Sequence, residues 1–474
     1  MELLLTCLRI SFWRNLMADK TKIAVIGAGI SGLSTAYWLD KAGYEVTVFE
    51  KSARTGGSII TEKTDGFLID LGPNSTLETS ETLKNLVHDL GLEEQKVYGN
   101  EASNNRYVVR GGQLHPIPMS PGKFLKTKLF SAKAKMRLLK EPFIKPTDGT
   151  DLSLADFVRY RLGQEFLDYA INPFVAGVYA GDPARLSTAA AFPKLYALEQ
   201  NYGSFIKGTI KGARERKKRK EVAKDRAKLF SFVNGMQTFT DALAKQLQGK
   251  LRLQTEIKSL IKRDSGFLLG LSQGEQSGTL IFDQVVLSVP TYALAGLLEN
   301  LQPETVPKLK NIYYPPVTVV FMGFKEKDVQ RELDGFGFLI PEVENRQILG
   351  SIWSSTIFPN RAPEGYVAFT TFVGGARQPQ NANLDDENIT DLVLRDLDDL
   401  VGLSGSPVLV KIKRWKRAIP QYAVGYTKIQ HMFNQLEKKM PGLYFAGNFR
   451  RGISVGDSVL CARETVDAIV QSKE

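Results

Sequence analysis

The chain has 474 residues, of which 43% are hydrophobic and 24% charged, a balance that predicts a globular protein of two or three domains and excludes a disordered one. The formal net charge of +11 favours an anionic partner. No run of eighteen uncharged apolar residues occurs, so no segment is typical of a transmembrane helix. The two cysteines, Cys7 and Cys461, form no Cys-x-x-Cys pair, which points to a reducing compartment, and three histidines argue against a metal site.

Residues 1–19 hold a short apolar run that an acidic residue precedes and that Arg9 and Arg14 follow. A secretory signal has its positive charge first and a longer apolar region. We therefore expect a disordered or mis-assigned start rather than a targeting signal.

A strand–helix–strand unit comes next. Residues Lys22–Ile26 form a short apolar, β-branched run that ends in glycine, and Ile30–Lys41 follows with the spacing of a helix. Gly43 is placed to end that helix, and residues 46–49 form a second apolar strand that leads to Glu50. This order predicts the start of a doubly wound parallel sheet, and so an α/β fold.

The turn after the first strand has the dinucleotide-binding spacing Gly-x-Gly-x-x-Gly, with the residues Gly27, Ala28, Gly29, Ile30, Ser31 and Gly32. The first glycine permits a tight turn, the second lets a pyrophosphate approach the backbone, and the third allows close helix–strand packing. The helix N-terminus adds partial positive charge, and Glu50 can accept hydrogen bonds from a ribose. Glycine spacing alone also fits an ordinary turn, but two strands, a helix and an acid in register favour the nucleotide.

Helical and β-rich segments alternate in the remainder of the chain. Residues 153–228 are mainly helical in pattern, residues 251–289 and 315–371 are rich in short strands, and residues 385–401 form an amphipathic helix. Residues 443–470 are typical of a strand, a glycine turn and a closing helix. A sheet that begins near the N-terminus and is completed at the C-terminus implies that the domains between are insertions.

Two segments concentrate the positive charge. Residues 204–228 hold eleven basic residues against three acidic ones, and residues 123–145 interleave basic with apolar side chains. Such runs are usually solvated helix faces, but they also suit an anionic surface, either lipid headgroups or an acidic substrate. Nucleic acid is not expected, because no nucleic-acid-binding motif accompanies the charge.

Further motifs indicate FAD rather than NAD. Arg54-Thr55-Gly56-Gly57 follows Glu50, Asp70-Leu71-Gly72-Pro73 comes shortly after, and Gly447-Asn448 precedes a glycine-rich turn into the last helix. Together they resemble the FAD-binding signature of the amine oxidase and phytoene desaturase superfamily. The resemblance implies non-covalent FAD, with these contacts beyond the glycine turn and Glu50: Arg54, Gly57, Ser58, Gly72, Pro73, Asn74, Ser75, Ile257, Gly447, Asn448, Ile453, Ser454 and Val455. No second Gly-x-Gly-x-x-Gly unit is present for a pyridine nucleotide, so the substrate is expected to reduce the flavin.

The middle of the chain is more specific. Residues 172–183 read Asn-Pro-Phe-Val-Ala-Gly-Val-Tyr-Ala-Gly-Asp-Pro, residues 335–341 read Gly-Phe-Gly-Phe-Leu-Ile-Pro, and residues 419–422 read Ile-Pro-Gln-Tyr. These motifs, in this order, resemble the oxygen-dependent protoporphyrinogen oxidase and coproporphyrinogen III oxidase family. The resemblance extends from about Lys22 to the C-terminus.

The family implies a three-part architecture: a Rossmann-like FAD-binding domain, an inserted β-rich substrate domain and a helical membrane-binding domain. On this sequence the FAD-binding domain takes residues 20–100, 229–290 and 410–474. The substrate domain takes residues 101–105 and 291–409, and the helical domain takes residues 106–228.

Position by position, the family's substrate contacts fall on Arg106, Gly177, Phe336, Gly337, Leu339, Ile352 and Phe372. Arg106 matches an arginine that anchors a substrate propionate, which suits the planar, bidentate guanidinium. Leu339, Ile352 and Phe372 match positions that sandwich the macrocycle, and Gly337 leaves room beside it. The alternatives without a functional role are a surface arginine at Arg106 and ordinary strand core at the apolar positions. Ala176 stands where some relatives have arginine, so a contact made by that arginine is missing here.

The resemblance implies six-electron oxidation of protoporphyrinogen IX to protoporphyrin IX, with oxygen as acceptor and hydrogen peroxide as product. Coproporphyrinogen III oxidation is the alternative, and a flavin amine oxidase, a carotenoid desaturase or a non-enzymatic flavoprotein are more distant ones. No catalytic acid–base pair is evident in the sequence. The expected location is peripheral, on the cytoplasmic side of a membrane, with a cytoplasmic protein as the alternative. The oligomeric state is open, a homodimer being one option.

Overall fold

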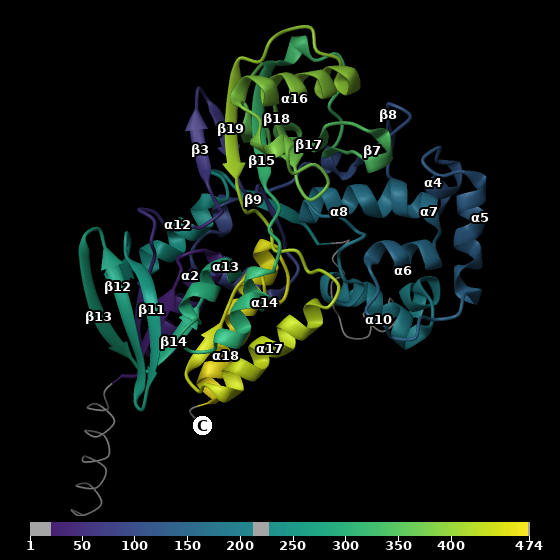
Figure 1. Cartoon of the computed structure of the whole chain (residues 1–474). Helices are drawn as coiled ribbons and strands as arrows, with labels where there is room; N and C mark the ends of the chain where they lie inside the picture. Colours follow the sequence, from purple (N-terminus) through teal and green to yellow (C-terminus); the bar gives the residue numbers. More distant parts are fainter. Residues whose placement is uncertain (1–19, 212–226, 473–474) are drawn as a thin grey trace, which may run out of the picture.

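The computed structural model describes residues 20–211 and 227–472, and these form three regions (Figure 1). A parallel sheet with helices on both faces lies in the lower part of the view, a seven-stranded sheet at the top, and a helical region at the right. Residues 1–19, for which we expect a disordered or mis-assigned start, lie outside the described residues. So do residues 212–226, which make up most of the basic segment 204–228.

The parallel sheet has the order β10-β2-β1-β14-β20, and each neighbouring pair in it is parallel. Its strands, in that order, are Leu251–Arg252, Glu45–Phe49, Lys22–Ile26, Gln284–Leu287 and Leu443–Phe445. β1 lies at the centre, and strands that follow it in the chain are added on both sides. The predicted doubly wound sheet is therefore confirmed.

Alternating side chains of β1 bury both faces of this sheet. Ile23 and Val25 pack into a core with four helices, whereas Ala24 and Ile26 pack into a second core on the other face. The helices of the first core are α2 (Ile30–Lys41), α3 (Glu81–Asp89), α12 (Gln237–Gln246) and α18 (Val455–Gln471). Those of the second are α13 (Thr291–Leu297), α14 (Val306–Lys310) and α17 (Tyr426–Lys439). Burial on both faces explains why the strands read as continuous apolar runs.

Three small sheets flank the parallel one. An antiparallel sheet covers the second core and consists of β11 (Glu256–Arg263), β12 (Gly266–Gln273) and β13 (Gln276–Phe282). The hairpin of β3 (Thr61–Thr64) and β4 (Phe67–Asp70) rises beside the seven-stranded sheet (Figure 1). The third sheet has the order β5-β9-β6, with the strands Thr76–Leu77, Leu229–Phe232 and Lys96–Tyr98.

The seven-stranded sheet has the order β19-β15-β18-β17-β16-β7-β8. Its strands, in that order, are Leu409–Trp415, Val317–Lys325, Tyr366–Gly374, Ile348–Trp353, Gly337–Leu339, Tyr107–Arg110 and Gln113–Pro116. One face is buried under α16 (Asp386–Val401), with Phe338, Trp353 and Phe369 in that core. Polar side chains on the outer face of α16 match the predicted amphipathic helix. The other face of the sheet turns toward the FAD-binding layer and the helical region.

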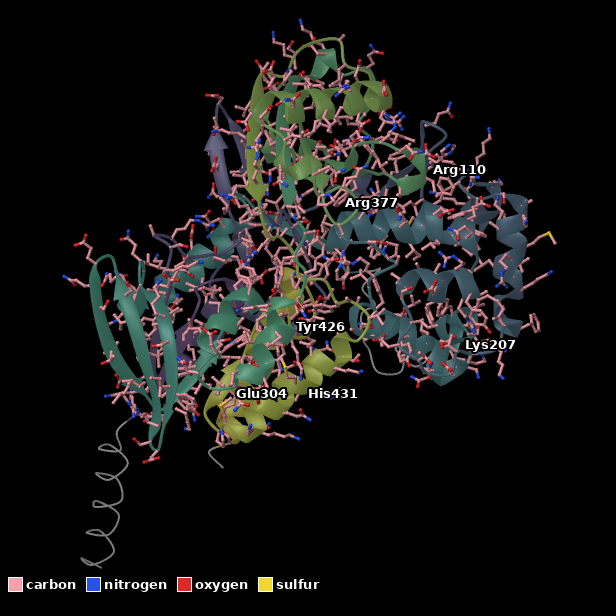
Figure 2. All side chains as sticks on the ribbon, viewed as in Figure 1. Arg110, Lys207, Glu304, Arg377, Tyr426 and His431 are labelled. Carbon is pink, nitrogen blue, oxygen red and sulfur yellow. The ribbon has the colours of Figure 1, made fainter. Side chains whose placement is uncertain are left out.

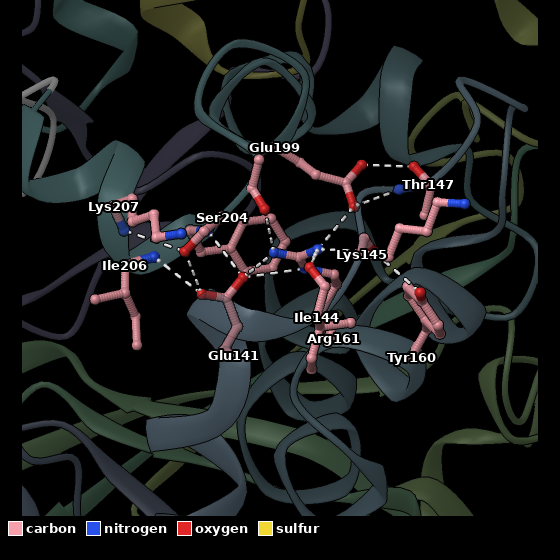
Figure 3. A network of polar contacts seen from close by, with 12 residues as sticks. Glu141, Ile144, Lys145, Thr147, Tyr160, Arg161, Glu199, Ser204, Ile206 and Lys207 are labelled. Carbon is pink, nitrogen blue, oxygen red and sulfur yellow. Dashed lines mark hydrogen bonds and ion pairs between the residues drawn. The ribbon is translucent and has the colours of Figure 1, made fainter.

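Short helices build the helical region: α4 (Pro121–Lys126), α5 (Ala132–Lys140), α6 (Leu154–Arg161), α7 (Gln164–Phe166), α8 (Asn172–Tyr179), α9 (Thr188–Ala191) and α10 (Pro193–Tyr202). Their interior holds an ion network in which Arg161 contacts the carboxylates of Glu141 and Glu199 (Figure 3). All three side chains are fully buried. Ser204 Oγ also donates to Glu141 at 2.6 Å, so this carboxylate ties separate helices together.

Two domain boundaries differ from those drawn on the sequence. Residues 107–116, assigned to the helical domain, form β7 and β8 in the seven-stranded sheet, where β7 pairs in parallel with β16. Residues 410–415, assigned to the FAD-binding domain, lie in β19 of the same sheet. Both differences arise because pairing between strands more than 85 residues apart leaves no local pattern in the sequence.

Candidate active site

The glycine turn between β1 and α2 leaves room for a ligand at one position. A Cβ on Gly27 (φ +104°) would lie 2.5 Å from the Ser288 carbonyl oxygen, and one on Gly32 would lie 1.9 Å from the Gly27 carbonyl oxygen. A Cβ on Gly29 would meet no atom within 4 Å. Gly29 is also the N-cap of α2 and offers no side-chain cap. Gly27 and Gly32 thus serve packing, whereas Gly29 keeps the space before the N-terminus of α2, including the N–H groups of Ile30 and Ser31, open to an anion.

Glu50 is held at the carboxyl end of β2 beside that turn. One carboxylate oxygen accepts a hydrogen bond from the Ala28 N–H at 2.9 Å, and the other accepts one from the Ser52 N–H at 2.9 Å. The side chain is half-buried. Each oxygen retains a lone pair, so the fixed carboxylate can still accept bonds from the two hydroxyls of a ribose.

The segment after Glu50 folds back onto the glycine turn. Gly56 donates to the Ala28 carbonyl oxygen at 2.8 Å, and a Cβ on Gly57 would lie 3.2 Å from the Gly29 Cα. Arg54 donates to the carbonyl oxygens of its own loop, at Thr55, Gly57 and Ile59. The structure therefore brings these predicted cofactor residues together, with Arg54 shaping the loop.

A second loop, residues 71–75, meets the first. A Cβ on Gly72 would lie 1.9 Å from the Ser58 carbonyl oxygen, so only glycine fits this approach. Pro73 is half-buried, and the half-buried pair Asn74 and Ser75 is joined by a side-chain hydrogen bond of 2.9 Å. Ser58 and Gly72, two predicted cofactor contacts from different loops, thus lie next to each other.

The C-terminal loop that contains Gly447 and Asn448 is held by two tyrosines. Tyr422 donates to the Asn448 carbonyl oxygen, and Tyr426, at the start of α17 (Figure 2), donates to the Phe449 carbonyl oxygen at 2.7 Å. Their rings stack, with centroids 4.3 Å apart. Burial raises the pKa of both phenols, so they remain neutral donors.

The same loop leads into α18. Ser454 is the N-cap of α18 and accepts from the Asp457 N–H at 3.1 Å, while half-buried Ile453 packs against the core of the helical region. Val455 begins the helix, so the positive end of the helix dipole lies at the loop that leads from Asn448. Ile257, by contrast, is buried in the core with Ala24 and Ile26. Its side chain serves packing, so a cofactor contact there would involve its backbone.

One polar residue beside the glycine turn was missed in the sequence. Ser288 directly follows β14, its carbonyl oxygen limits the space at Gly27, and its buried Oγ has no hydrogen-bond partner among the described residues. A buried, unpaired hydroxyl at the carboxyl end of a central strand fits a dinucleotide oxygen. The signal was available: residues 284–287 form an apolar strand that ends at Ser288.

The predicted substrate residues share one face of the seven-stranded sheet. Gly337 pairs with Ile352 across β16 and β17, and Leu339 and Phe372 are both paired with Gly350. Because paired residues point to the same side, Leu339, Ile352 and Phe372 all lie on the face opposite α16. Each of these three side chains is half-buried, unlike the fully buried core on the α16 side.

Two glycines on this face are required by close packing within the protein. Gly337 has φ +129°, and a Cβ there would lie 2.1 Å from the Ser351 carbonyl oxygen. A Cβ on Gly177, in α8, would lie 2.4 Å from a methyl carbon of Leu339. The structure thus places Gly177 directly on the predicted apolar face.

Arg106 lies at the edge of the same face. It directly precedes β7, and extending the β16–β7 pairing by one residue aligns it with Gly337. Its guanidinium carbon lies 5.2 Å from the ring centre of half-buried Phe336. Among residues 20–211 and 227–472, no carboxylate forms an ion pair with it. Burial lowers the pKa of the guanidinium, but part of the side chain reaches solvent and an arginine stays charged at neutral pH.

The cofactor loops and the substrate face meet. A small cavity is lined both by Asn74 of the cofactor loop and by Ile352 of the sheet, together with Phe321 and Thr370. A larger cavity of about 270 Å³ lies behind Tyr426 and is lined by none of the predicted site residues. The first cavity therefore lies at the junction of the cofactor loop and the sheet.

Comparison with known proteins agrees with this geometry. Residues 30–470 match the family described as flavin containing amine oxidoreductase. The mitochondrial protoporphyrinogen oxidase of Nicotiana tabacum is 33% identical over 96% of this chain and 95% of its own length. The coproporphyrinogen III oxidase of Bacillus subtilis is 34% identical over 94% of this chain and 97% of its own length.

A crystal structure of an Exiguobacterium protein provisionally named protoporphyrinogen oxidase has a TM-score of 0.80 and 25% identity, and covers 96% of this chain and 100% of that one. The open space at Gly29 and the unpaired Ser288 hydroxyl fit FAD, which is the cofactor of this fold. The chain belongs to the flavin-containing amine oxidoreductase family and is an FAD-dependent oxidoreductase.

Proposed function

We propose that this protein oxidises a porphyrinogen to a porphyrin in haem biosynthesis. The observation that carries the proposal is the half-buried apolar face of Leu339, Ile352 and Phe372, with the unpaired cation of Arg106 at its edge and the cofactor loop at Asn74 beside it. A largely apolar macrocycle with acidic side arms needs such a combination. Relatives named protoporphyrinogen oxidase and coproporphyrinogen III oxidase support the same substrate class.

Separate groups of residues bind the cofactor and the substrate. The glycine turn, Glu50 and the loops at Arg54, Gly72 and Asn448 hold FAD, which when bound supplies a two-electron acceptor. Arg106 pairs with a substrate carboxylate and fixes the macrocycle along the sheet. Leu339, Ile352 and Phe372 exclude water from one side of the ring and hold it in place.

Proton transfer does not call for a dedicated base on this face. In the paired rows of the sheet, the ionisable side chains on this side include no carboxylate: they are Arg106, Arg110, His115, Lys325, Tyr366, Lys411 and Lys413. Pyrrole N–H groups would therefore lose their protons to solvent or to the substrate itself. Each porphyrinogen loses six electrons and six hydrogens, and three oxygen molecules take them up as three molecules of hydrogen peroxide.

Two substrates remain within the proposal. Protoporphyrinogen IX and coproporphyrinogen III differ at two ring positions, which carry vinyl groups in the first and propionates in the second. The carotenoid desaturase alternative fits less well, because a desaturase substrate offers no carboxylate to the cation of Arg106.

The test is anaerobic mixing of the purified holoprotein with each porphyrinogen. The proposal expects bleaching of the flavin absorbance and then porphyrin fluorescence, with stoichiometric hydrogen peroxide after oxygen is admitted. A flavin that keeps its absorbance with both porphyrinogens, but bleaches with a primary amine or a carotenoid, would overturn the proposal.

We also propose that the helical region contacts an anionic membrane from the cytoplasmic side. Large apolar side chains on and beside α4 and α5 are unusually exposed, among them Leu139 at 70% and Phe143 at 87%. Six lysines around them are exposed: Lys123, Lys126, Lys128, Lys133, Lys140 and Lys145. Glu141 is the one acidic residue between positions 117 and 147, and it is buried against Arg161.

An exposed apolar patch with a basic surround is typical of a surface that inserts shallowly among anionic lipids. No helix among residues 20–211 and 227–472 has the length and hydrophobicity to cross a membrane. The contact that we propose is therefore peripheral, through this patch.

A further inference from the structure

A cation lies at the far end of the apolar face, opposite Arg106. Strand pairing places one continuous row of residues across five strands, from β16 to β19: Leu339, Gly350, Phe372, Val319 and Lys413. Paired residues point to the same side of a sheet, so Lys413 faces the same side as Leu339 and Phe372. Arg106 lies in the neighbouring row at the other edge. The face predicted to hold the macrocycle is thus bordered by a positive charge on both sides.

Lys413 has no acidic partner that would account for its position. The side chain is half-buried, and no carboxylate of the described residues forms an ion pair with it. Its Nζ lies 5.0 Å from the ring centre of Trp415, two residues along the strand. Trp415 in turn donates its indole N–H to the Leu71 carbonyl oxygen at 2.9 Å. This places the ammonium group next to the loop at Gly72 that meets the cofactor.

The separation of the two cations suits a ligand with acids on opposite sides. Arg106 and Lys413 are five strand intervals apart, which corresponds to roughly 24 Å between the two backbones. Both cations end long side chains, and no carboxylate of the described residues forms an ion pair with either, so each is available to an acid of a ligand. A ligand with acids on one side only would engage one cation and leave the other against vinyl groups.

We infer that Lys413 binds a second substrate carboxylate at the edge opposite Arg106, and that it raises the preference for coproporphyrinogen III over protoporphyrinogen IX. The inference rests on the proposed function and adds to it the residue that reads the two positions where the substrates differ. A propionate at that edge gains a charge-assisted hydrogen bond, whereas a vinyl group gains none.

A purely structural alternative is that Lys413 only packs on Trp415. That role would change stability or flavin content, and it would affect both substrates alike. The ratio of kcat/KM on the two porphyrinogens separates the alternatives, because a packing defect cancels in the ratio.

The experiment compares this ratio in the wild-type holoprotein and in three variants. Lys413→Met keeps the unbranched apolar stem on Trp415 and removes the charge, whereas Lys413→Arg keeps the charge. Lys411→Met is the matched control: Lys411 lies on the same strand and face but pairs with Phe321, which is covered by β4. Equilibrium binding of coproporphyrin III and protoporphyrin IX, followed by porphyrin absorbance, gives a readout independent of turnover.

We expect Lys413→Met to lower kcat/KM on coproporphyrinogen III about 10- to 100-fold, the effect of one lost charge-assisted bond, and to change protoporphyrinogen IX less than about twofold. Lys413→Arg should restore most of the preference, and Lys411→Met should leave the ratio unchanged. Coproporphyrin III binding should weaken in parallel in Lys413→Met.

Equal losses on both substrates, no loss on coproporphyrinogen III, or the same loss in Lys411→Met would overturn the inference. These results are distinct from failure of the proposed function, in which the wild type oxidises neither porphyrinogen. If Lys413→Met does not fold, Lys413→Gln and product binding by the wild type at increasing salt replace it. Salt must then weaken coproporphyrin III more than protoporphyrin IX.

Discussion

Asp70 at the end of β4 and Arg361 before β18 form a buried ion pair with an Oδ2–Nη2 distance of 3.0 Å, and both side chains are 2% exposed. The pair joins the FAD-binding layer to the substrate sheet. The other oxygen of Asp70 accepts from Thr61 Oγ1 at 2.6 Å and from the Met236 N–H at 3.0 Å. Four residues further on, Asn74 lines the cavity at the junction of the two regions. The ion pair therefore sets how the cofactor loop meets the sheet.

Removing one partner of this pair should lower the free energy of unfolding more than removing both partners. Arg361→Met leaves a buried carboxylate without its cation, and we expect a loss of about 3–5 kcal/mol in the free energy of unfolding. The double variant Asp70→Asn with Arg361→Met should recover part of that loss. Urea unfolding of the holoprotein measures both. Arg463→Met, which breaks an exposed pair with Asp467, is the control and should cost less than about 1 kcal/mol. Strictly additive losses at Asp70 and Arg361 would contradict the coupling.

The buried network around Glu141 should make stability fall in acid (Figure 3). Burial raises the pKa of Glu141, but hydrogen bonds from Ser204, the Phe205 N–H, Arg161 and the Ile206 N–H outweigh burial and leave the pKa below its usual value. A carboxylate with a lowered folded-state pKa stabilises the fold above its unfolded value of about 4.3, and this stability is lost as the pH falls through the folded-state pKa.

Glu141→Gln should therefore lower stability at pH 7 and flatten the loss of stability below a pH of about 4.3. Thermal unfolding between pH 7 and pH 3 checks this. Glu464→Gln, at an exposed pair with Arg451, should keep the wild-type slope. An unchanged acid slope in Glu141→Gln would show that other carboxylates govern it.

Gly29→Asp should yield a folded protein that lacks flavin. A Cβ on Gly29 meets no protein atom within 4 Å, so the fold tolerates the side chain, whereas the carboxylate would occupy the path of the pyrophosphate and repel it. Flavin absorbance of the purified variant and its far-ultraviolet circular dichroism check the two parts. Gly296→Asp is the matched control, since Gly296 also has open space around it and is exposed in α13. A yellow Gly29→Asp protein would defeat the assignment of this turn.

Arg106→Ala should reduce kcat/KM on a porphyrinogen about 30- to 1000-fold, which corresponds to roughly 2–4 kcal/mol of lost binding to a carboxylate. The loss should appear mainly in KM if the contact is equally strong before and during oxidation. Flavin content should stay near wild type, because Arg106 contacts Phe336 rather than a cofactor loop. A porphyrinogen with esterified propionates should be almost insensitive to the variant. Equal losses on acid and ester would show that Arg106 acts through the fold.

The variant Leu139→Glu with Phe143→Glu should weaken binding to anionic vesicles by at least about tenfold, because two exposed apolar side chains lose their burial among lipids. Flotation with anionic and neutral vesicles at low and high salt measures it. Ile281→Glu provides the control, since Ile281 is 61% exposed on β13, away from the patch. Equal binding of the wild type to neutral and anionic vesicles would remove the electrostatic part of the proposal.

The sequence by itself determined the nucleotide-binding unit. Strand Lys22–Ile26, the glycine turn, helix Ile30–Lys41 and Glu50 all appear where the pattern predicted them. Their positions depend on interactions within about thirty residues: strand and helix periodicity, a positive φ at Gly27 and an acid at the end of a strand. Such local signals can be recognised in the sequence alone.

Only the tertiary structure decided which distant residues share the substrate face. Pairing of β7 with β16 brought Arg106 beside Gly337, and the position of β19 next to β15 brought Lys413 onto the row of Leu339 and Phe372. The unpaired hydroxyl of Ser288 likewise became visible only beside Gly27. The physical reason is that register between strands far apart in the chain is fixed by burial of whole faces against other layers, and no short segment of sequence records that packing.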